Sequence, residues 1–361
     1  MTDNHSLWQS FVQGSFAIRW QTVQALPKYG DEFIQPLVEL LSSSDSELRW
    51  FAAKALGEFD SPKTRQVLAG LLSSPDAELR DVAMQALVRS GDRALDVLIS
   101  KLADARLPVV QTLSQIYSDG TIAPLLQVLD DDDSQIRAIA LGALANYPQP
   151  ILAEVLVRHL QDPAAIVRCE ACLGLGLMAA RYDPAAELLD MASLLAPALG
   201  DCDQNVRHQA IVALGRVGTV AAIDLLGKVL LEADTPESLQ IQAARQLAWQ
   251  EQPDSLDYLQ TALTQATTPV TLEIIQLLGR IEEPNLQRAI VEILTELFAN
   301  SQTRLQQPEL RKSLAMTLGQ LGHPTAQKLL IALANDQDPI VQIHGQYALQ
   351  QLMKSGQLPG D

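Results

Sequence analysis

The stretch DSELRWFAAKALG at residues 45–57 recurs in related form along the whole chain. In each copy a polar residue, usually Arg and here called the marker, follows an aliphatic residue (Ala105 is the exception), and a Leu stands seven positions later. The markers are Arg19, Arg49, Arg80, Arg106, Arg137, Arg168, Arg207, Gln240, Thr271, Arg311 and Gln342. The paired leucines are Leu26, Leu56, Leu87, Leu113, Leu144, Leu175, Leu214, Leu247, Leu278, Leu318 and Leu349. Successive markers are most often 31 residues apart, so the chain is a tandem repeat.

Each repeat has room for two short helices. Ala52, Ala53 and Leu56 follow the marker Arg49 at three, four and seven positions, which is one face of an α-helix. A second amphipathic run, such as RQVLAGLL at 65–72, follows each first helix. The pattern therefore predicts an all-α superhelix of about ten helical hairpins, in which neighbouring repeats share one continuous core.

The helix ends carry their own signals. An Asp stands four residues before several markers, where its carboxylate can accept backbone N–H groups of the first turn. These residues are Asp45, Asp76, Asp133, Asp203 and Asp338. A Gly directly follows the paired Leu in several repeats, and we expect it to adopt the left-handed conformation at the helix C-terminus. These residues are Gly57, Gly176, Gly215, Gly279 and Gly319.

The repeat pattern also predicts how the chain is divided. Residues 1–14 are expected to form an N-terminal capping helix, 15–337 the repeats, and 338–361 a C-terminal capping helix and tail. Half-units at both ends can close the core of a stack. Two units are long, with inserts near 181–190 and 298–310. The unit that begins at Arg106 is short and contains Pro108, which predicts a late-starting or kinked helix there.

The overall composition narrows the setting. The formal net charge is −17, so the summed field repels nucleic acid and anionic membrane surfaces alike. Three cysteines are too few for a disulfide framework. The first residues contain no signal-peptide pattern, and no stretch is apolar enough to span a membrane. We therefore expect a cytoplasmic protein that contacts neither nucleic acid nor the membrane. Its oligomeric state is left open by the sequence.

The repeat phrase resembles the HEAT repeat in its short, phycobilisome-lyase-type (HEAT-like) form. The resemblance rests on the order aliphatic-Arg-x-x-Ala-x-x-Ala-Leu-Gly, as in LRWFAAKALG at 48–57 and VRHQAIVALG at 206–215. It implies a curved solenoid whose second helices line the concave face. It also implies a ladder of Asp and Arg side chains between repeats, weakened where Gln240, Thr271 and Gln342 replace Arg. The ladder residues would be Asp45, Arg49, Asp76, Arg80, Asp133, Arg137, Arg168, Asp203 and Arg207.

The first functional hypothesis is a non-catalytic scaffold that binds a protein partner in its concave groove. Trp20 and Trp50 both come directly after a marker, and Phe51 follows Trp50. Aromatic side chains are favoured anchors at interfaces, so these three are candidate contacts. The alternative is that they cover the N-terminal end of the stack together with Trp8. An acidic surface favours a partner with basic or mixed faces.

The resemblance supplies a second hypothesis, a lyase subunit or chaperone that attaches or removes a bilin chromophore on a phycobiliprotein of the cyanobacterial phycobilisome. A bilin would then be the ligand; under the scaffold hypothesis no cofactor is expected. Other HEAT-like proteins include a di-iron hydroxylase that depends on His-Glu pairs and a DNA glycosylase with a basic groove. Neither fits, because no His is followed by Glu and the charge is negative.

A third hypothesis is a partner in iron–sulfur or metal assembly. Cys169 and His208 occupy equivalent positions in neighbouring repeats, and Cys202 lies in the turn before the helix of His208. Thiolates suit iron and zinc, so these three are the candidate ligands. The competing interpretation is that the sulfur atoms only pack, as expected for Cys172 at a core position.

Overall fold

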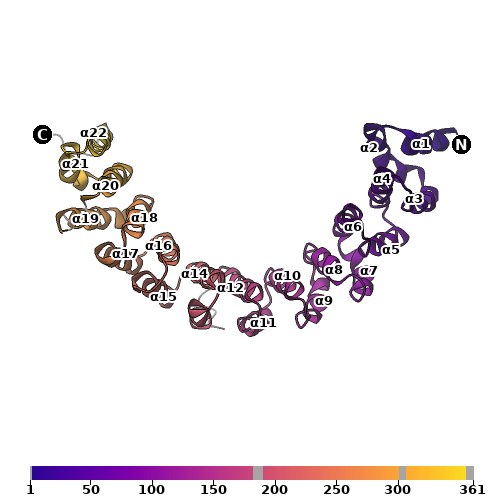
Figure 1. Ribbon diagram of the computed structural model, residues 1–361, viewed down its shortest axis with the longest axis horizontal. Helices are drawn as coiled ribbons and strands as arrows, with labels where there is room; N and C mark the ends of the chain where they lie inside the picture. The colour runs from indigo at the N-terminus through magenta and orange to yellow at the C-terminus, as the bar shows by residue number, and fades with distance from the viewer. Residues whose placement is uncertain (1, 182–189, 301–305, 355–361) are drawn as a thin grey trace. The chain divides into compact units, whose positions relative to one another are not determined.

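The computed structural model describes residues 2–181, 190–300 and 306–354 of the chain (Figure 1). These residues form two compact units, residues 1–152 and 153–361, which are treated separately below. The described residues contain helices and turns but no strand, as predicted. The central part of the insert near 181–190, part of the loop 298–310 and the tail after Lys354 lie outside the described residues.

Unit 1 is built from short helices. They are α1 (Thr2–Gln13), α2 (Phe16–Ala25), α3 (Ile34–Leu40), α4 (Ser46–Leu56), α5 (Pro62–Leu71), α6 (Ala77–Ser90), α7 (Leu95–Lys101), α8 (Arg106–Leu113), α9 (Ile122–Gln127) and α10 (Ser134–Leu144). Short 3₁₀ turns at Leu26–Tyr29, Asp31–Phe33, Gly91–Ala94 and Asp119–Thr121 lead between them. Helix α11 (Ile151–His159) begins at the end of this unit and continues into the next.

Unit 2 continues the same pattern. Its helices are α12 (Ala165–Ala179), α13 (Met191–Leu195), α14 (Gln204–Val217), α15 (Val220–Leu231), α16 (Glu237–Gln250), α17 (Pro253–Gln265), α18 (Thr268–Leu278), α19 (Pro284–Asn300), α20 (Pro308–Leu321), α21 (Gln327–Ala334) and α22 (Pro339–Lys354). Turns of 3₁₀ helix lie at Ala196–Gly200 and Pro324–Ala326.

Two layers run through each unit. Helices that carry a marker, called first helices, pack on one another: α2, α4, α6, α8 and α10 in unit 1, and the even-numbered helices α12 to α22 in unit 2. The second helices form the other layer, as in the contacts of α5 with α7 and of α15 with α17. Taken one unit at a time, Figure 1 shows the first helices on the inner side of the unit's curve and the second helices on its outer side. The expectation that second helices line the concave face is therefore wrong.

Small residues explain this curvature. A Cβ built on Gly57 would lie 2.7 Å from the Cβ of Ala86, and one on Gly176 would lie 2.8 Å from the Cα of Ala213. Successive first helices thus approach each other closely, and the more closely spaced layer becomes the inner one. Gly57 and Gly279 have ordinary right-handed backbone angles, so the expected left-handed cap is wrong at these positions. At Gly57 and Gly176, close packing rather than backbone freedom favours a glycine after the paired Leu.

The paired leucines form the centre of the core. All of them from Leu26 to Leu318 have no exposed surface. Leu349, on the last first helix, is partly exposed. Burying a leucine stabilises the fold by roughly 1.5–3 kcal/mol, so the repeated Leu accounts for much of the stability of the stack.

The predicted N-caps are confirmed. Asp45 Oδ1 accepts the N–H groups of Glu47 (2.9 Å) and Leu48 (3.3 Å), and the other predicted Asp residues cap their own helices in the same way. The late helix start at Pro108 is also confirmed. Helix α8 begins at the marker Arg106, whereas α4 begins three residues before its marker, because proline is tolerated only in the first turn.

Marker arginines join successive repeats. Arg49, Arg137 and Arg168 each donate to the backbone carbonyl six residues earlier, at 2.9, 2.7 and 2.8 Å. Among the described residues, markers that also reach an acid of the next repeat include Arg19–Glu47, Arg49–Asp76, Arg106–Asp131, Arg168–Asp201 and Arg311–Asp336. Three of these acids stand two residues before the cap Asp, so in those repeats Asp133, Asp203 and Asp338 cap helices while their neighbours pair with Arg. Arg80 donates to the carbonyl of Ser74 at 2.7 Å.

The ladder changes in the middle of unit 2. Arg207 has a buried Nε with no hydrogen-bond partner among the described residues. Gln240 Nε2 instead donates to the carbonyl of Glu232 at 3.0 Å, and the Thr271 hydroxyl lies 3.5 Å from the carbonyl of Ala266. An ion pair between a marker and the next repeat is seen again at Arg311–Asp336, where two parallel bonds of 2.7 and 3.0 Å form.

Candidate protein-binding surface

An aromatic cluster lies on the first helices of unit 1. The rings of Trp20 on α2 and Trp50 on α4 stack with centroids 6.1 Å apart, and Phe16 stacks on Trp20 at 6.2 Å. Phe16 and Trp20 are 58% and 43% exposed. Offset stacking holds such rings in place without burying them, which leaves a rigid apolar surface in contact with water. We call Phe16, Trp20 and Trp50 the aromatic face.

Phe51 has a different position from the one predicted. It is fully buried and makes edge contacts with Phe16 and Trp50, both at 5.1 Å. Phe51 therefore supports the aromatic face from below and cannot itself contact a partner.

Trp8 belongs to a separate cluster. Its ring stacks on Phe11 at 5.6 Å and on Phe33 at 5.9 Å, between α1 and the turn before α3. Phe11 and Phe33 are both buried, so this second cluster is the apolar core of the N-terminal end. Trp8 thus covers the N-terminal end of the stack, the role considered above for Trp20 and Trp50. The aromatic face remains in contact with solvent.

Two hollows flank the aromatic face. One of about 510 Å³ is bounded by Phe16 and Trp50 and by the carboxylates of Glu47, Glu78 and Asp81. The other, of about 240 Å³, lies beside Trp20. Lys54, which lines the second hollow, places its ammonium 5.9 Å from the Trp20 ring centroid. The surface thus combines rings with charges of both signs, the composition of an interface with an apolar centre and a polar rim.

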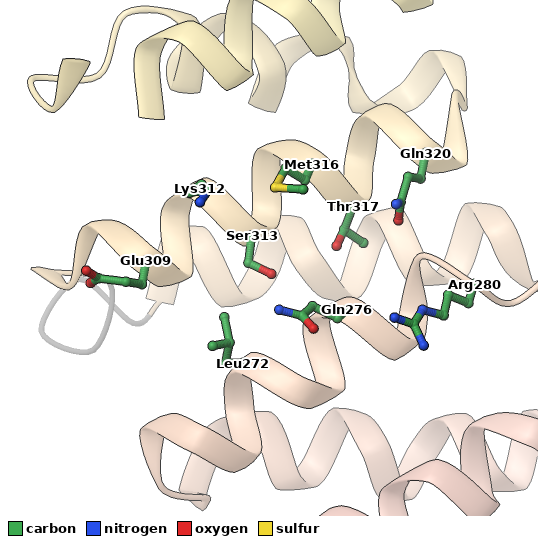
Figure 2. Close-up of a pocket in the computed structure, with 9 residues that line it drawn as sticks. All are labelled: Leu272, Gln276, Arg280, Glu309, Lys312, Ser313, Met316, Thr317 and Gln320. Atoms are coloured by element: carbon green, nitrogen blue, oxygen red, sulfur yellow. The ribbon is translucent and has the colours of Figure 1, made fainter. Parts of the chain in front are cut away.

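The corresponding face of unit 2 contains a polar cavity. It measures about 360 Å³ and lies between α18 and α20. Figure 2 shows its lining: Leu272, Gln276 and Arg280 come from α18 or its end, and Glu309, Lys312, Ser313, Met316, Thr317 and Gln320 from α20. The Thr317 hydroxyl donates to the carbonyl of Ile275 at 3.0 Å, which ties the two helices together at the cavity floor.

The candidate metal ligands do not form a ligand cluster. Cys202 is exposed, and its Sγ lies 3.6 Å from Asp201 Oδ1 and 3.8 Å from the Arg168 guanidinium. Cys169 is half-buried, and burial raises the pKa of its thiol. His208 is exposed on α14. Among the described residues, no group of three or more His, Cys, Asp or Glu side chains is placed to hold a metal ion.

Cys172 packs in the core as expected. It has no exposed surface, and burial raises the pKa of its thiol to about 12. A thiol with such a pKa stays protonated at neutral pH and is inert as a nucleophile.

The aspartates that pair with marker arginines have lowered pKa values. Hydrogen bonding to Arg168, in two parallel bonds of 2.7 and 2.8 Å, holds the pKa of Asp201 below its ordinary value despite partial burial. The same cause lowers the pKa of Asp76 beside Arg49. For Asp336, burial acts to raise the pKa, but the bonds from Arg311 and from a backbone N–H outweigh it. These acids stay ionised in the folded protein and link repeats; they are not poised for proton transfer.

Comparison with known proteins identifies the class. The sequence profile of the family described as HEAT repeats matches residues 11–88, 34–117, 122–194, 153–237 and 191–279. Because these matches together cover well over half of the chain, the protein belongs to the HEAT-repeat family. No curated protein matches the sequence.

Several solved structures share the fold. Kap95p, in its complex with RanGDP, is 13% identical with a TM-score of 0.66; the alignment covers 96% of this chain and 54% of Kap95p. Importin beta is 16% identical with a TM-score of 0.56, over 99% of this chain and 56% of its own. The chain thus spans about half the length of each. At these identities the likeness shows the fold alone.

A third structure is more distant. The complex of CpcE and CpcF of phycocyanin lyase from Nostoc sp. PCC7120 is 21% identical over 64% of this chain and 94% of its own, with a TM-score of 0.33. A score this low supports no argument about function. Within the described residues, no helix is both long and apolar enough to cross a membrane.

Proposed function

We propose that this protein is a non-catalytic HEAT-repeat scaffold that binds a protein partner on the inner, first-helix layer of its repeats. The observation that supports the proposal best is the aromatic face. The exposed rings of Phe16 and Trp20, with the partly exposed Trp50 stacked beside them, cost free energy in an isolated protein, and such anchors recur at the centres of protein interfaces. Kap95p, which shares the fold, forms a complex with the protein RanGDP.

The charges near the aromatic face indicate the kind of partner. Glu78 and Asp81 are exposed beside the hollow that Phe16 and Trp50 bound, and the chain as a whole carries −17. A partner with a basic or mixed-charge surface would meet these carboxylates at the rim and the rings at the centre, while nucleic acid would be repelled. Cytoplasmic location accords with this proposal and is tested by fractionation of the native cell.

The experiment is a capture of partners from native lysate with tagged wild-type protein and two variants. The double substitution Trp20→Ala/Trp50→Ala removes the aromatic face, and Trp249→Ala is the matched control, because Trp249 is 83% exposed on α16 in the other unit. The proposal expects one stoichiometric partner that the control retains and the double variant loses, with helical circular dichroism unchanged in all three. Equal capture by all three proteins would remove the aromatic face from the proposal.

The bilin-lyase alternative has no structural observation in its favour and stays a prediction from the repeat type. It is separated from the scaffold proposal by an absorbance spectrum of the protein purified from a bilin-producing host, since a bound bilin adds visible bands. The metal-assembly alternative is tested by metal analysis after anaerobic purification. Stoichiometric iron that is lost on Cys169→Ser would support it.

A further inference from the structure

The cavity between α18 and α20 has features that packing alone does not require. We propose that it binds a carboxylate side chain, glutamate or aspartate, carried on an acidic and apolar segment of a protein partner. The inference rests on the proposed scaffold function in one respect, that the ligand belongs to a protein. It concerns unit 2 and uses none of the residues of the aromatic face.

The first observation is an unpartnered hydroxyl. Ser313 is only 5% exposed, yet its Oγ has no hydrogen-bond partner among the described residues. Figure 2 shows this hydroxyl directed into the gap between the helices, on the side of Gln276. One turn later Thr317, on the same face of α20, does find a carbonyl acceptor on α18. Buried polar groups without partners are rare and costly, so a donor left in a cavity wall indicates an acceptor that the chain does not supply.

The second observation is the charge of the lining. Arg280 and Lys312 border the cavity, and within the described part of the chain neither is paired with a carboxylate. Glu309 is the acid of the lining and stands at the opposite end from Arg280 in Figure 2. The cavity is therefore locally positive in a protein of net charge −17. Nearby arginines such as Arg245, Arg288 and Arg311 all have acid partners, which makes the unpaired cations of the cavity available to an anion.

The donors together suit a carboxylate. Its two oxygens can accept from the Ser313 hydroxyl, the Gln276 amide and a cation, and such charge-assisted bonds are the stronger ones in proteins. Leu272 and Met316 supply the apolar part of the lining for the methylene groups of the same side chain. A volume of about 360 Å³ is enough for one side chain and its backbone.

The apolar rim indicates a protein segment rather than a free small molecule. Met316 stands five residues after its marker and is 45% exposed. Tyr347 holds the equivalent position on α22, which packs against α20. The side chains of Tyr347 and Ile343 are each 63% exposed. These side chains extend the surface beyond the cavity over the next helix. A segment with a carboxylate in the cavity would cover them with its neighbouring apolar residues.

The probe is a fluorescein-labelled peptide that alternates leucine and glutamate, and its matched partner has glutamine in place of every glutamate. Fluorescence polarisation with the full chain should show at least about tenfold tighter binding of the glutamate peptide, as expected for hydrogen bonds to a charged group. The double substitution Arg280→Gln/Lys312→Gln should abolish this preference. Arg288→Gln, which removes an exposed cation on α19 outside the cavity, should leave it unchanged.

Ser313→Ala separates ligand binding from a structural role. Removing an unpartnered buried hydroxyl should leave the melting temperature unchanged or raise it. It should also lower the affinity for the glutamate peptide by about threefold to tenfold. Equal binding of the two peptides, or no binding of either, overturns the proposal. So does competition by N-acetylglutamate at the same concentration as the peptide, because the ligand would then be a free carboxylate. None of these outcomes depends on Trp20 or Trp50, so the scaffold proposal can stand or fail separately.

Discussion

The first-helix layers of the two units share one framework and differ in what they expose. In unit 1 the residues directly after successive markers include Trp20 and Trp50, whose rings stack. In unit 2 the same position holds His208, Leu272 and Lys312, and a polar cavity opens beside the last two. The repeat therefore determines where a side chain stands, and the variable positions determine what it can bind. This division allows one fold to present two chemically different surfaces.

The shared framework is the part whose removal should have the largest effect. Leu56 in unit 1 and Leu214 in unit 2 are both fully buried at the equivalent position. Substituting either by Ala should lower the free energy of unfolding by roughly 2–5 kcal/mol, measured by urea denaturation. Leu349→Ala, at the partly exposed last copy, should cost less. If Leu349→Ala proved as costly as the other two, the burial pattern described above would be contradicted.

The ion pairs distinguish two neighbouring junctions. Arg168 makes two short bonds to Asp201, and both side chains are 12% exposed, whereas the Nε of Arg207 has no partner among the described residues. Arg168→Gln should therefore cost about 1.5–3 kcal/mol of unfolding free energy, and Arg207→Gln close to nothing. Equal losses of unfolding free energy for the two variants would show that the ion pair with Asp201 is not the source of the stabilisation by Arg168.

The same pair has a defined pH dependence. The pKa of Asp201 is lower in the folded protein than its ordinary value of about 3.9. Its stabilising contribution is therefore complete above that ordinary value and is lost as the pH falls through the lower, folded pKa. Asp201→Asn should lower stability by a constant amount between pH 5 and 7, and the difference from wild type should shrink below about pH 4. If the stability difference between wild type and Asp201→Asn instead grew as the pH fell, the pKa of Asp201 would be raised rather than lowered by folding, which contradicts the ion pair with Arg168.

Two glycines should respond to alanine in opposite directions. Gly176 lies against the backbone of Ala213, so Gly176→Ala should force the first helices apart and cost about 1–3 kcal/mol. Gly70, in the second-helix layer, has open space where a Cβ would stand, with no neighbouring atom within 4 Å. Gly70→Ala should therefore stabilise the helix by about 0.5–1 kcal/mol. Thermal unfolding of the two variants measures both. A stabilising Gly176→Ala would contradict the close packing of the inner layer.

The smallest effect concerns the thiols. Cys202 is exposed, Cys169 is half-buried, and Cys172 is buried with its pKa raised to about 12. A thiol reagent at pH 8 should therefore modify Cys202 first, Cys169 more slowly and Cys172 only after unfolding. Mass spectrometry of the labelled protein gives the order. Early labelling of Cys172 would mean that the helix α12 opens locally or packs differently.

Much of the fold followed from the sequence because it depends on periodicity. The marker, the Leu seven positions later and the cap Asp are local patterns, and each appeared where it was expected, as at Asp45, Arg49 and Leu56. The role of the glycines did not follow, since close contact such as that of Gly57 with Ala86 involves residues of different repeats. The side of the curve occupied by the first helices depends on the same contacts.

The candidate sites could be predicted only in part. Trp20 and Trp50 share a repeat position, which brought them together as expected, but a sequence does not distinguish an exposed ring from a buried one such as Phe51. The acids that pair with Arg carried an overlooked signal, an Asp-x-Asp pattern at 131–133, 201–203 and 336–338. The cavity near Ser313 was not predicted, because an unpartnered hydroxyl is visible only once its surroundings are known.

The most direct test of the scaffold account is the dissociation constant of the captured partner, measured by calorimetry with purified proteins. Loss of one hot-spot aromatic costs at least about 2 kcal/mol, or about thirtyfold in affinity, so Trp20→Ala/Trp50→Ala should weaken binding by more than about thirtyfold even if only one of the two is a hot spot. The Trp249→Ala control should bind like wild type. An unchanged dissociation constant for the double variant, with its helicity intact, would contradict the claim that the aromatic face is the partner-binding surface.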